Sequence, residues 1–413
     1  MTPLRPSPDS SPESTPSRPL FEVVRASLAD CEDPSVRRDW ESLVSTERTL
    51  YAQYQSPAWF DHLRATGDPG LLPPLLVRDR DGRLAGIAPL AYGEREIVFT
   101  TRERVLWRSP LKVVSVQGGE PPIPEDGGLV DRLLAAALES APGADGVYLH
   151  SVRADGFLGC RIEAARGRIG DLVAYAPGGS RPFHWLELPG SFREWLGKFG
   201  AKKRYNLQRQ HRLLAEHAHG DLVLRRIEEP RDVAGFAGDT ATVVEKSWQG
   251  ELATSGVTRA ARDPRVLDDL ARRGLLRSYL LVAQGSPCAF VVGYQYGDVY
   301  HYAEIGYDRA LARFSPGTVL LTLLLEDLWQ HRTPRLVNFG IGEAGYKREF
   351  GNRESRDASV FLLRDTPANR ARVVAHRAFR ACVDLAKRVR AARGGAVPPV
   401  GAEDERVDGD ARR

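Results

Sequence analysis

Residues 298–350 constrain the fold of this chain more than any other stretch. Alternating aromatic side chains around Tyr300 and Tyr302 predict a strand with one face towards solvent. A Ser-Pro-Gly-Thr run at 315–318 then predicts a helix start, because Ser or Thr can cap a helix and Pro suits its first turn. A mostly apolar helix, 319–330, and a second strand, 335–339, follow. Such a unit is a right-handed crossover between parallel strands.

The remaining chain alternates strands and helices in a mixed order. Up to residue 188 the pattern predicts a helix pair, a hairpin and then strands and helices in turn. After it, the pattern predicts a strand, two helices, a three-strand meander and the crossover unit. We therefore expect an α/β fold (α+β, mixed sheet) with helices on both faces of the sheet. We expect two related halves, at 20–189 and 190–391, between disordered tails at 1–19 and 392–413.

The bulk composition excludes several classes of protein. A net charge of only +4 over 413 residues gives no global field for nucleic acid. No apolar run is long enough to cross a bilayer, and the first residues lack the apolar segment of a signal peptide. The four cysteines are far apart, which favours a reducing compartment over disulfides or a zinc site. We expect a cytoplasmic protein with no metal and no membrane span, and the oligomeric state is left open.

This order of elements, with a phosphate-ready helix after the third meander strand, resembles the GNAT acyltransferase fold. Residues 56–363 are similar to the CelD/BcsL-type branch, which is related to the FemAB aminoacyltransferases and contains two GNAT-like domains in tandem. The residues that carry the resemblance are Ser56, Pro57, Trp59, Phe60, Lys203, Arg204, Tyr205, Asn206, Leu207, Trp248, Tyr307, Asp308, Ser315, Pro316, Gly317, Asn338, Phe339, Gly340, Tyr346, Lys347 and Phe350. The resemblance implies a second half that holds the donor and a degenerate first half that shapes the acceptor cleft.

The start of the crossover helix is the candidate donor site. Its backbone N–H groups and dipole suit a diphosphate, and Arg313 adds positive charge. An ordinary helix cap explains the same residues. The GNAT phosphate loop, Q/R-x-x-G-x-G/A, is matched only at its last position by residues 312–317. The residues assigned to binding of an acyl-CoA donor are Arg313, Ser315, Pro316, Gly317, Thr318 and Asn338.

Glu304 is the candidate catalytic base, because an amine must lose a proton before it attacks a thioester. Strict alternation would place Tyr302 and Glu304 on one face of their strand. An ion pair with an arginine is the structural alternative for Glu304. The resemblance puts Tyr346 and Lys347 at the rim of the gap that holds the thioester. Lys347 would stabilise an oxyanion there, and Tyr346 would protonate the departing thiolate.

A basic run at 198–212 is the candidate acceptor-binding segment. As a helix it would place Lys202, Tyr205, Arg209 and Arg212 along one face, suited to phosphates of an acceptor or of a tRNA. A solvated helix face is the alternative. Residues assigned to substrate binding are Lys203, Arg204, Tyr205, Tyr302 and Trp248, the last beside a loop long enough to form a lid.

Three functions follow from these residues and from the resemblance. The first is an N-acyltransferase that moves an acyl group from an acyl-CoA, acetyl-CoA first among them, to an amine. Its acceptor would be a small molecule or a polysaccharide or cell-envelope precursor. The second is a FemAB-like transferase that uses aminoacyl-tRNA on a peptide or cell-wall precursor. The third is a non-catalytic binding module on the same scaffold.

Overall fold

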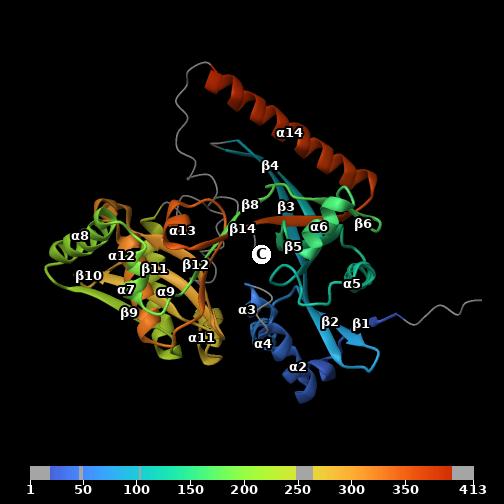
Figure 1. Ribbon diagram of the computed structural model, residues 1–413, viewed down its shortest axis with the longest axis horizontal. Helices are drawn as coiled ribbons and strands as arrows, with labels where there is room; N and C mark the ends of the chain where they lie inside the picture. Colours follow the sequence, from blue (N-terminus) through green and yellow to red (C-terminus); the bar gives the residue numbers. More distant parts are fainter. Residues whose placement is uncertain (1–18, 46–49, 102–103, 248–263, 393–413) are drawn as a thin grey trace, which may run out of the picture.

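The computed structural model describes the chain except for residues 1–18, 46–49, 102–103, 248–263 and 393–413. Both predicted tails, apart from their innermost residues, and Trp248 lie outside the described residues. Within the described ranges, fourteen strands form one continuous sheet, flanked by helices (Figure 1). The predicted mixed α/β class is confirmed.

The first half alternates helices and strands along residues 21–187. Its elements are β1 (Phe21–Arg25), α1 (Leu28–Glu32), α2 (Pro34–Ser45), α3 (Ala52–Gln55), α4 (Pro57–Ala65), β2 (Leu71–Asp79), β3 (Leu84–Thr100), β4 (Val105–Val116), α5 (Gly127–Ser140), β5 (Gly146–Arg153), α6 (Phe157–Ala164), β6 (Arg168–Ile169), β7 (Leu172–Tyr175) and β8 (Arg181–Glu187). In the outer part of the β3–β4 hairpin, Ile97 and Phe99 are buried, whereas Val105, Leu106 and Trp107 are exposed.

The second half contains the meander and the crossover unit. Its elements are α7 (Phe192–Gly197), α8 (Ala201–His217), β9 (Leu222–Ile227), α9 (Pro230–Glu245), α11 (Pro264–Arg272), β10 (Ser278–Ala283), β11 (Ser286–Tyr296), β12 (Val299–Tyr307), the 3₁₀ helix η2 (Arg309–Phe314), α12 (Pro316–Gln330), β13 (Leu336–Ile341), α13 (Gly345–Phe350), β14 (Arg353–Arg364) and α14 (Pro367–Ala392).

The two halves use the same strand order. In the first half, β1 to β4 pair antiparallel and β5 joins β4 in parallel. In the second half, β9 to β12 pair antiparallel and β13 joins β12 in parallel. Helix α5 connects the parallel pair of the first half, and α12 connects that of the second. The predicted parallel crossover and the predicted repeat of two halves are therefore both present.

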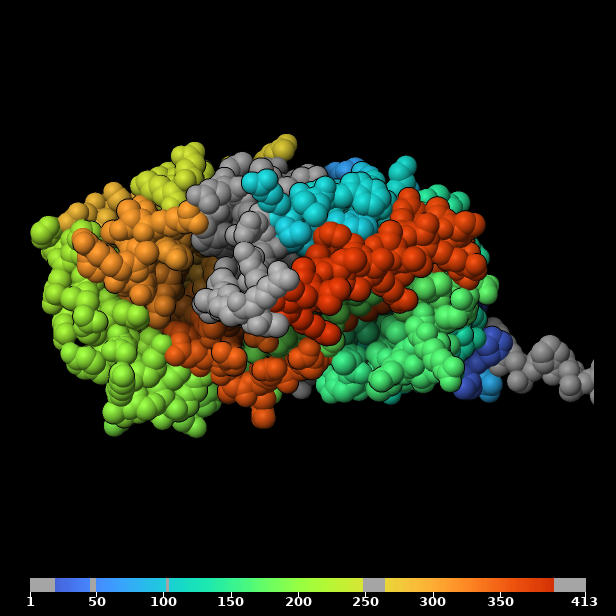
Figure 2. Space-filling view, turned by 90° about the horizontal axis from the view of Figure 1, so that it is seen from above, coloured from blue at the N-terminus to red at the C-terminus, as the bar shows by residue number. Residues whose placement is uncertain are grey.

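Strands β8 and β14 link the two halves into one sheet. β8 pairs with β13 of the second half, while β14 pairs with β5 of the first half and with β8. Helix α14 then lies across the first half (Figure 2), where the His376 ring is 3.1 Å from the carbonyl oxygen of Val98. The sequence pattern grouped residues 353–391 with the second half, because a strand's own pattern does not name its pairing partner. The boundary at residue 189 stays a prediction.

Apolar cores lie on both faces of the sheet in each half. In the second half, α7, α8 and α12 cover one core, and α9 and α11 cover another. Trp59 of α4, a first-half helix, packs into the core under α9 and α11. The halves therefore share buried apolar surface, which fixes α3 and α4 beside the second half. Among the described helices, none is long and apolar enough to cross a membrane.

Candidate functional site

Helix α12 begins directly after a 3₁₀ turn, with Ser315 in the left-handed conformation at φ 54°. Ser315 makes no side-chain cap to the helix. The hydroxyl instead accepts a hydrogen bond of 3.2 Å from the Gln210 side chain of α8. Proline occupies the first turn, which contains no acidic residue. The suggested serine cap is thus wrong, and the first-turn N–H groups face no capping carboxylate of that turn.

Aromatic and basic side chains surround this helix start. The Arg313 guanidinium lies 4.6 Å from the centre of the Phe314 ring. The His217 ring, at the end of α8, also stacks on Phe314, with the two ring centres 4.6 Å apart. Gly317 lies close to Tyr307, whose ring would be 3.5 Å from an added Cβ atom. The structure therefore brings Arg313, Ser315 and Gly317 together at one helix end, as the sequence predicts.

The parallel strands β12 and β13 pair over only three residues, from Val299 with Leu336 to His301 with Asn338. β12 continues to Tyr307 and β13 to Ile341 without further pairing to each other. Two parallel strands that cease to pair leave backbone N–H and C=O groups open to another partner. This unpaired stretch lies next to the start of α12 in the chain.

Asn338 holds the first half against this point. Its side-chain amide donates to the carbonyl oxygen of Leu50 at 2.8 Å and accepts from the Gly340 N–H at 2.7 Å. Its nitrogen also lies 3.4 Å from Nδ1 of His301. Asn338 is 3% exposed. The structure therefore gives Asn338 a bridging role between the halves, and its assignment to donor binding stays a prediction.

A bulge in the β11–β12 pair decides the position of Glu304. Val292 pairs with Glu304 and Gly293 with Tyr302, so Ala303 is the extra residue. Val292 lies in the core under α9 and α11, whereas Tyr302 lies in the core under α12. Because a bulge reverses the alternation, Glu304 is on the face opposite Tyr302. The expectation of a common face for these two side chains is wrong.

His301 shares the face of Glu304. It pairs with Tyr294, which belongs to the same core as Val292. The rings of Tyr54 and Tyr51, from the α3 region of the first half, lie 5.5 Å and 6.5 Å from the His301 ring. His301 is 3% exposed and Glu304 6%. The buried His301 imidazole thus faces the first half, and the buried Glu304 carboxyl group lies on the same face of the sheet.

Gly293 is the sequence signal that marks this bulge. A Cβ atom there would overlap the Tyr300 hydroxyl and lie 2.6 Å from the carbonyl oxygen of Arg277. Glycine inside a strand pattern is typical of a bulge or of a close approach. A bulge predicted opposite Gly293 would place Glu304 on the face of His301, so this glycine is the sequence signal for the observed position of Glu304.

Tyr346 and Lys347 lie at the other side of β12. The Tyr346 ring is 5.9 Å from Tyr302 and 6.3 Å from Phe339, all on the α12 face. The Lys347 ammonium donates to the carbonyl oxygen of Ile341 at 2.7 Å. The structure thus gathers Tyr302, Tyr346 and Lys347 near the end of β13, and it separates Glu304 from them by the thickness of the sheet.

Helix α8 carries the predicted basic face. Lys202, Tyr205, Arg209 and Arg212 are all exposed, as the helical spacing predicts. Lys203 instead pairs with Glu349 of α13 at 2.6 Å, and the Arg204 guanidinium donates to the carbonyl oxygen of Phe199. These two side chains hold α8 in place, which favours Tyr205 and the exposed arginines for contact with a ligand.

Lys198, at the end of α7, opens the basic run and is exposed as a residue, but its ammonium group is held by backbone carbonyl oxygens. Its ammonium donates to the carbonyl oxygens of Phe350 and Gly351 at 2.6 and 2.9 Å. It also lies 4.9 Å from the centre of the Phe199 ring. Desolvation lowers the pKa of Lys198 to about 8. Lys198 thus caps the C-terminal end of α13, where the chain turns into β14.

Residues 201–348 match a family model described as an acetyltransferase (GNAT) domain. The match runs from α8 through the meander and α12 to α13. With the repeated strand order, it defines the class: a mixed α/β protein with a GNAT acetyltransferase fold, built of two GNAT-like units in tandem. The finer placement in the CelD/BcsL-type branch stays a prediction.

Solved structures agree with this fold. The crystal structure of FemX is similar at 12% sequence identity, covering 83% of this chain and 98% of that chain with a TM-score of 0.54. A conserved protein of unknown function from Bacteroides thetaiotaomicron is similar at 10% identity, over 83% and 99% of the two chains, with a TM-score of 0.51. At these identities the likeness shows the fold alone. No curated protein matches.

Proposed function

We propose that this chain is an N-acyltransferase that moves an acyl group, acetyl first among them, from acyl-CoA to an amine. The acceptor would be a small molecule or a polysaccharide or cell-envelope precursor. One observation carries the proposal: inside the matched GNAT domain, β12 and β13 cease to pair after His301 and Asn338, and the unpaired end of β12 leads through η2 into the start of α12. On this proposal the donor has its diphosphate at that helix start and its thioester between the two strands.

The side chains at the helix start suit an anionic donor. The first turn of α12 is free of acidic residues, and Arg313 precedes it. Backbone N–H groups of Gly317 and Thr318 at a helix N-terminus attract phosphate oxygens through hydrogen bonds and the helix dipole. Pro316 has no backbone N–H group, but the proposed phosphate contacts use those of Gly317 and Thr318, so its presence removes none of them. Asn338 would position the donor through β13.

The acceptor amine would approach from the side of the first half. His301 lies beneath the tyrosines of the α3 region, and Glu304 shares its face of the sheet. Glu304 would take a proton from the amine, directly or through a water. The amine nitrogen then bonds to the thioester carbonyl carbon as the carbon–sulfur bond breaks. Lys347 would stabilise the oxyanion, and Tyr346 would give its proton to the leaving thiolate.

The residues proposed for the acceptor come from both faces. Tyr302 would line the gap on the α12 side, next to Tyr346. Tyr205 is exposed on α8, and its neighbours Lys203 and Arg204 fix the helix that presents it. Trp248 belongs to the same proposal and lies outside the described residues.

Calorimetric titration with acetyl-CoA tests the donor site. Gly317→Trp should abolish binding, because its side chain starts at the Tyr307 ring and fills the helix start. Gly235→Trp is the matched control, since an added Cβ atom meets nothing within 4 Å on α9. Tight binding that survives Gly317→Trp, or that is lost equally in Gly235→Trp, refutes the donor site.

The base is tested separately from the donor. Glu304→Gln should keep acetyl-CoA binding and lower kcat by about 10²–10⁴-fold, the usual contribution of a general base. The pH profile of the remaining activity should lose its acidic limb. An intact phenotype in vivo for both Glu304→Gln and Lys347→Ala would favour the non-catalytic binding module, whereas an unchanged kcat would exclude Glu304 as the base.

A second candidate function rests on the exposed basic face of α8. Lys202, Arg209 and Arg212 are exposed along one side, and such a row suits the phosphates of a tRNA acceptor stem. The chain would then be a FemAB-like transferase with aminoacyl-tRNA as donor. Ribonuclease treatment should abolish that activity and leave an acyl-CoA-dependent activity intact. Arg209→Ala with Arg212→Ala should weaken tRNA binding and make it less dependent on salt.

A further inference from the structure

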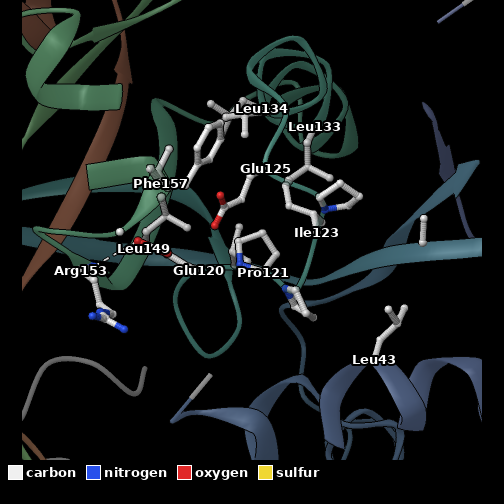
Figure 3. Close-up of a pocket in the computed structure, with 17 residues that line it drawn as sticks. Leu43, Glu120, Pro121, Ile123, Glu125, Leu133, Leu134, Leu149, Arg153 and Phe157 are labelled. Atoms are coloured by element: carbon white, nitrogen blue, oxygen red, sulfur yellow. Dashed lines mark hydrogen bonds between the residues drawn. The ribbon is translucent and has the colours of Figure 1, made fainter. Parts of the chain in front are cut away.

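A cavity of about 830 Å³ opens in the first half, away from the site above (Figure 3). It lies between α5, the start of α6 and the ends of β4 and β5, and its volume is typical of a small-molecule site. Its walls are mostly apolar, with Val116, Leu133, Leu134 and Leu149 from the strands and α5, and Phe157 from α6.

The cavity occupies the place in the first half that the proposed donor site occupies in the second. Val116 and Leu149 form the last residue pair of the parallel strands β4 and β5, and both line the cavity. Helix α5 leaves β4 as α12 leaves β12. The two halves therefore have openings at equivalent positions in the fold. The side chains of the cavity in the first half differ from those at the start of α12.

The start of α5 is acidic, unlike the start of α12. Asp126 caps the helix by accepting the Leu129 N–H at 2.5 Å, and Glu125 comes directly before it. A carboxylate cap occupies the N–H groups that would bind a phosphate, and its charge repels one. The cavity is therefore unsuited to a diphosphate.

Two carboxyl groups give the cavity its charge. Figure 3 shows the Glu125 carboxyl group pointing in between Phe157 and Ile123. Glu120 also lines it and accepts the backbone N–H of Arg153 at 3.1 Å. The Arg153 guanidinium points away from the cavity and pairs with Asp155 at 2.9 Å.

Burial raises the pKa of Glu120 to about 7. The charges that act on it are those of Asp357 and Asp155, which raise its pKa, and that of Arg153, which lowers it. The carboxylate of Glu120 is thus costly without a cation beside it, and a bound ammonium group would relieve that cost.

We propose that this cavity binds an organic amine, with its ammonium group between Glu120 and Glu125 and its hydrocarbon body against the leucines of α5. An anionic ligand would meet two carboxyl groups in an apolar surrounding. A neutral apolar ligand would leave the same groups desolvated without a partner, which costs free energy. Charge complementarity therefore selects a cation with an apolar body. The proposal goes beyond the acyl-transfer function and does not depend on it.

Calorimetric titration of the full chain with octylamine tests the site, with octanoate and 1-octanol as matched probes. We expect saturable octylamine binding and much weaker binding of the other two. Glu120→Gln and Glu125→Gln should each weaken octylamine binding about tenfold, the usual effect of losing one charged hydrogen-bond partner. Glu125 is exposed, so its replacement leaves the fold intact.

Glu139→Gln is the matched control, because Glu139 is exposed on α5 and does not line the cavity. It should bind octylamine like the wild type, and so should Gly317→Trp, which blocks only the donor site. Octanoate binding as tight as that of octylamine overturns the proposal. So does octylamine binding that is absent, or unchanged in both Glu120→Gln and Glu125→Gln.

Discussion

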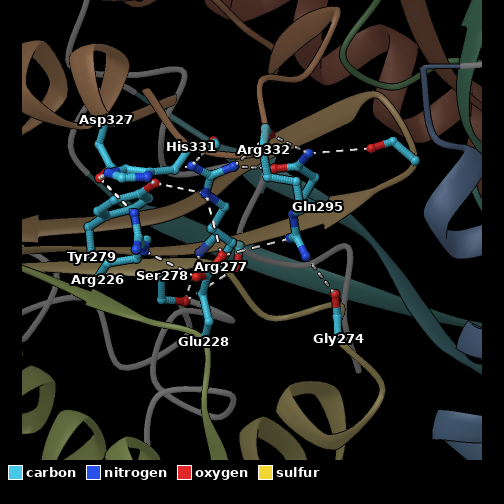
Figure 4. A network of polar contacts seen from close by, with 12 residues as sticks. Arg226, Glu228, Gly274, Arg277, Ser278, Tyr279, Gln295, Asp327, His331 and Arg332 are labelled. Carbon is cyan, nitrogen blue, oxygen red and sulfur yellow. Dashed lines mark hydrogen bonds and ion pairs between the residues drawn. The ribbon is translucent and has the colours of Figure 1, made fainter. Parts of the chain in front are cut away.

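Replacing Arg277 by methionine should destabilise the second half by about 3 kcal/mol, through loss of a buried guanidinium. This side chain, at the start of β10, is 0% exposed and ties β10 and β11 to the end of α12 (Figure 4). It donates to the Tyr279 hydroxyl at 2.9 Å, the Gln295 side chain at 2.6 Å, the Asp327 carboxylate at 3.2 Å, and the carbonyl oxygens of His331 and Arg332 at 2.6 and 2.9 Å.

The size of the expected loss in unfolding free energy depends on the hydrogen bonds that each acceptor of Arg277 retains in the variant. Removing one partner of a buried ion pair costs about 3–5 kcal/mol, because the other charge is left desolvated. Asp327 would retain Arg226 at 2.9 Å and Tyr279 at 2.7 Å. The Arg332 carbonyl oxygen would retain the Gln295 amide at 3.0 Å. These remaining hydrogen bonds place the loss at the lower end of the range.

The assay is equilibrium unfolding in urea, followed by tryptophan fluorescence and by far-UV circular dichroism. Coinciding transitions are required before a single free energy of unfolding is extracted. Arg277→Lys should lose less, because an ammonium group keeps the charge and up to three donors. Arg335→Met is the surface control: Arg335 pairs with Asp298 at 2.9 Å and is 40% exposed, so its loss should stay below about 1 kcal/mol. A loss below about 1 kcal/mol for Arg277→Met would refute the reasoning.

Three further predictions concern other buried groups. Gly293→Ala should cost about 1–3 kcal/mol by overpacking, since its Cβ atom would overlap the Tyr300 hydroxyl; an unchanged urea midpoint would contradict this. Asn338→Ala should cost about 1–3 kcal/mol in the same assay, because the Leu50 carbonyl oxygen loses its donor, and wild-type stability would argue against that link between the halves. Burial raises the pKa of Glu120 from 4.5 to about 7, so between these values the folded state binds more protons than the unfolded state and stability falls as pH rises. Glu120→Gln should flatten that fall between pH about 5 and 8, and an identical slope would exclude Glu120 as its source.

The local pattern predicted most of the elements of the second half. The start of α12 was predicted because Ser, Pro and Gly at 315–317 are typical of a helix start, and β12 and β13 because their apolar residues recur with the strand period. The basic face of α8 followed from helical spacing. These features depend on neighbours within a few residues, which the sequence displays directly.

The candidate site was only partly predictable. The rings of Tyr302 and Tyr346 lie 5.9 Å apart, and Arg313 and Gly317 lie at one helix end, but no sequence pattern showed that the two tyrosines would meet. The face of β12 that carries Glu304 was not predicted correctly, because the bulge opposite Gly293 arises from the pairing of two strands and not from the pattern of either one. The roles of these residues in catalysis stay predictions.

The sequence by itself determined the order of the elements, the parallel crossover and the chemistry available at the start of α12. Only the tertiary structure decided which half each late element joins: β14 pairs with β5, and α14 covers the first half. It also decided that α3 covers His301 and that a charged cavity opens beside α5. The physical reason is the distance along the chain over which each kind of interaction acts. Helix and strand propensities act between near neighbours, whereas strand partners and cavity walls are chosen by packing between segments far apart in the chain.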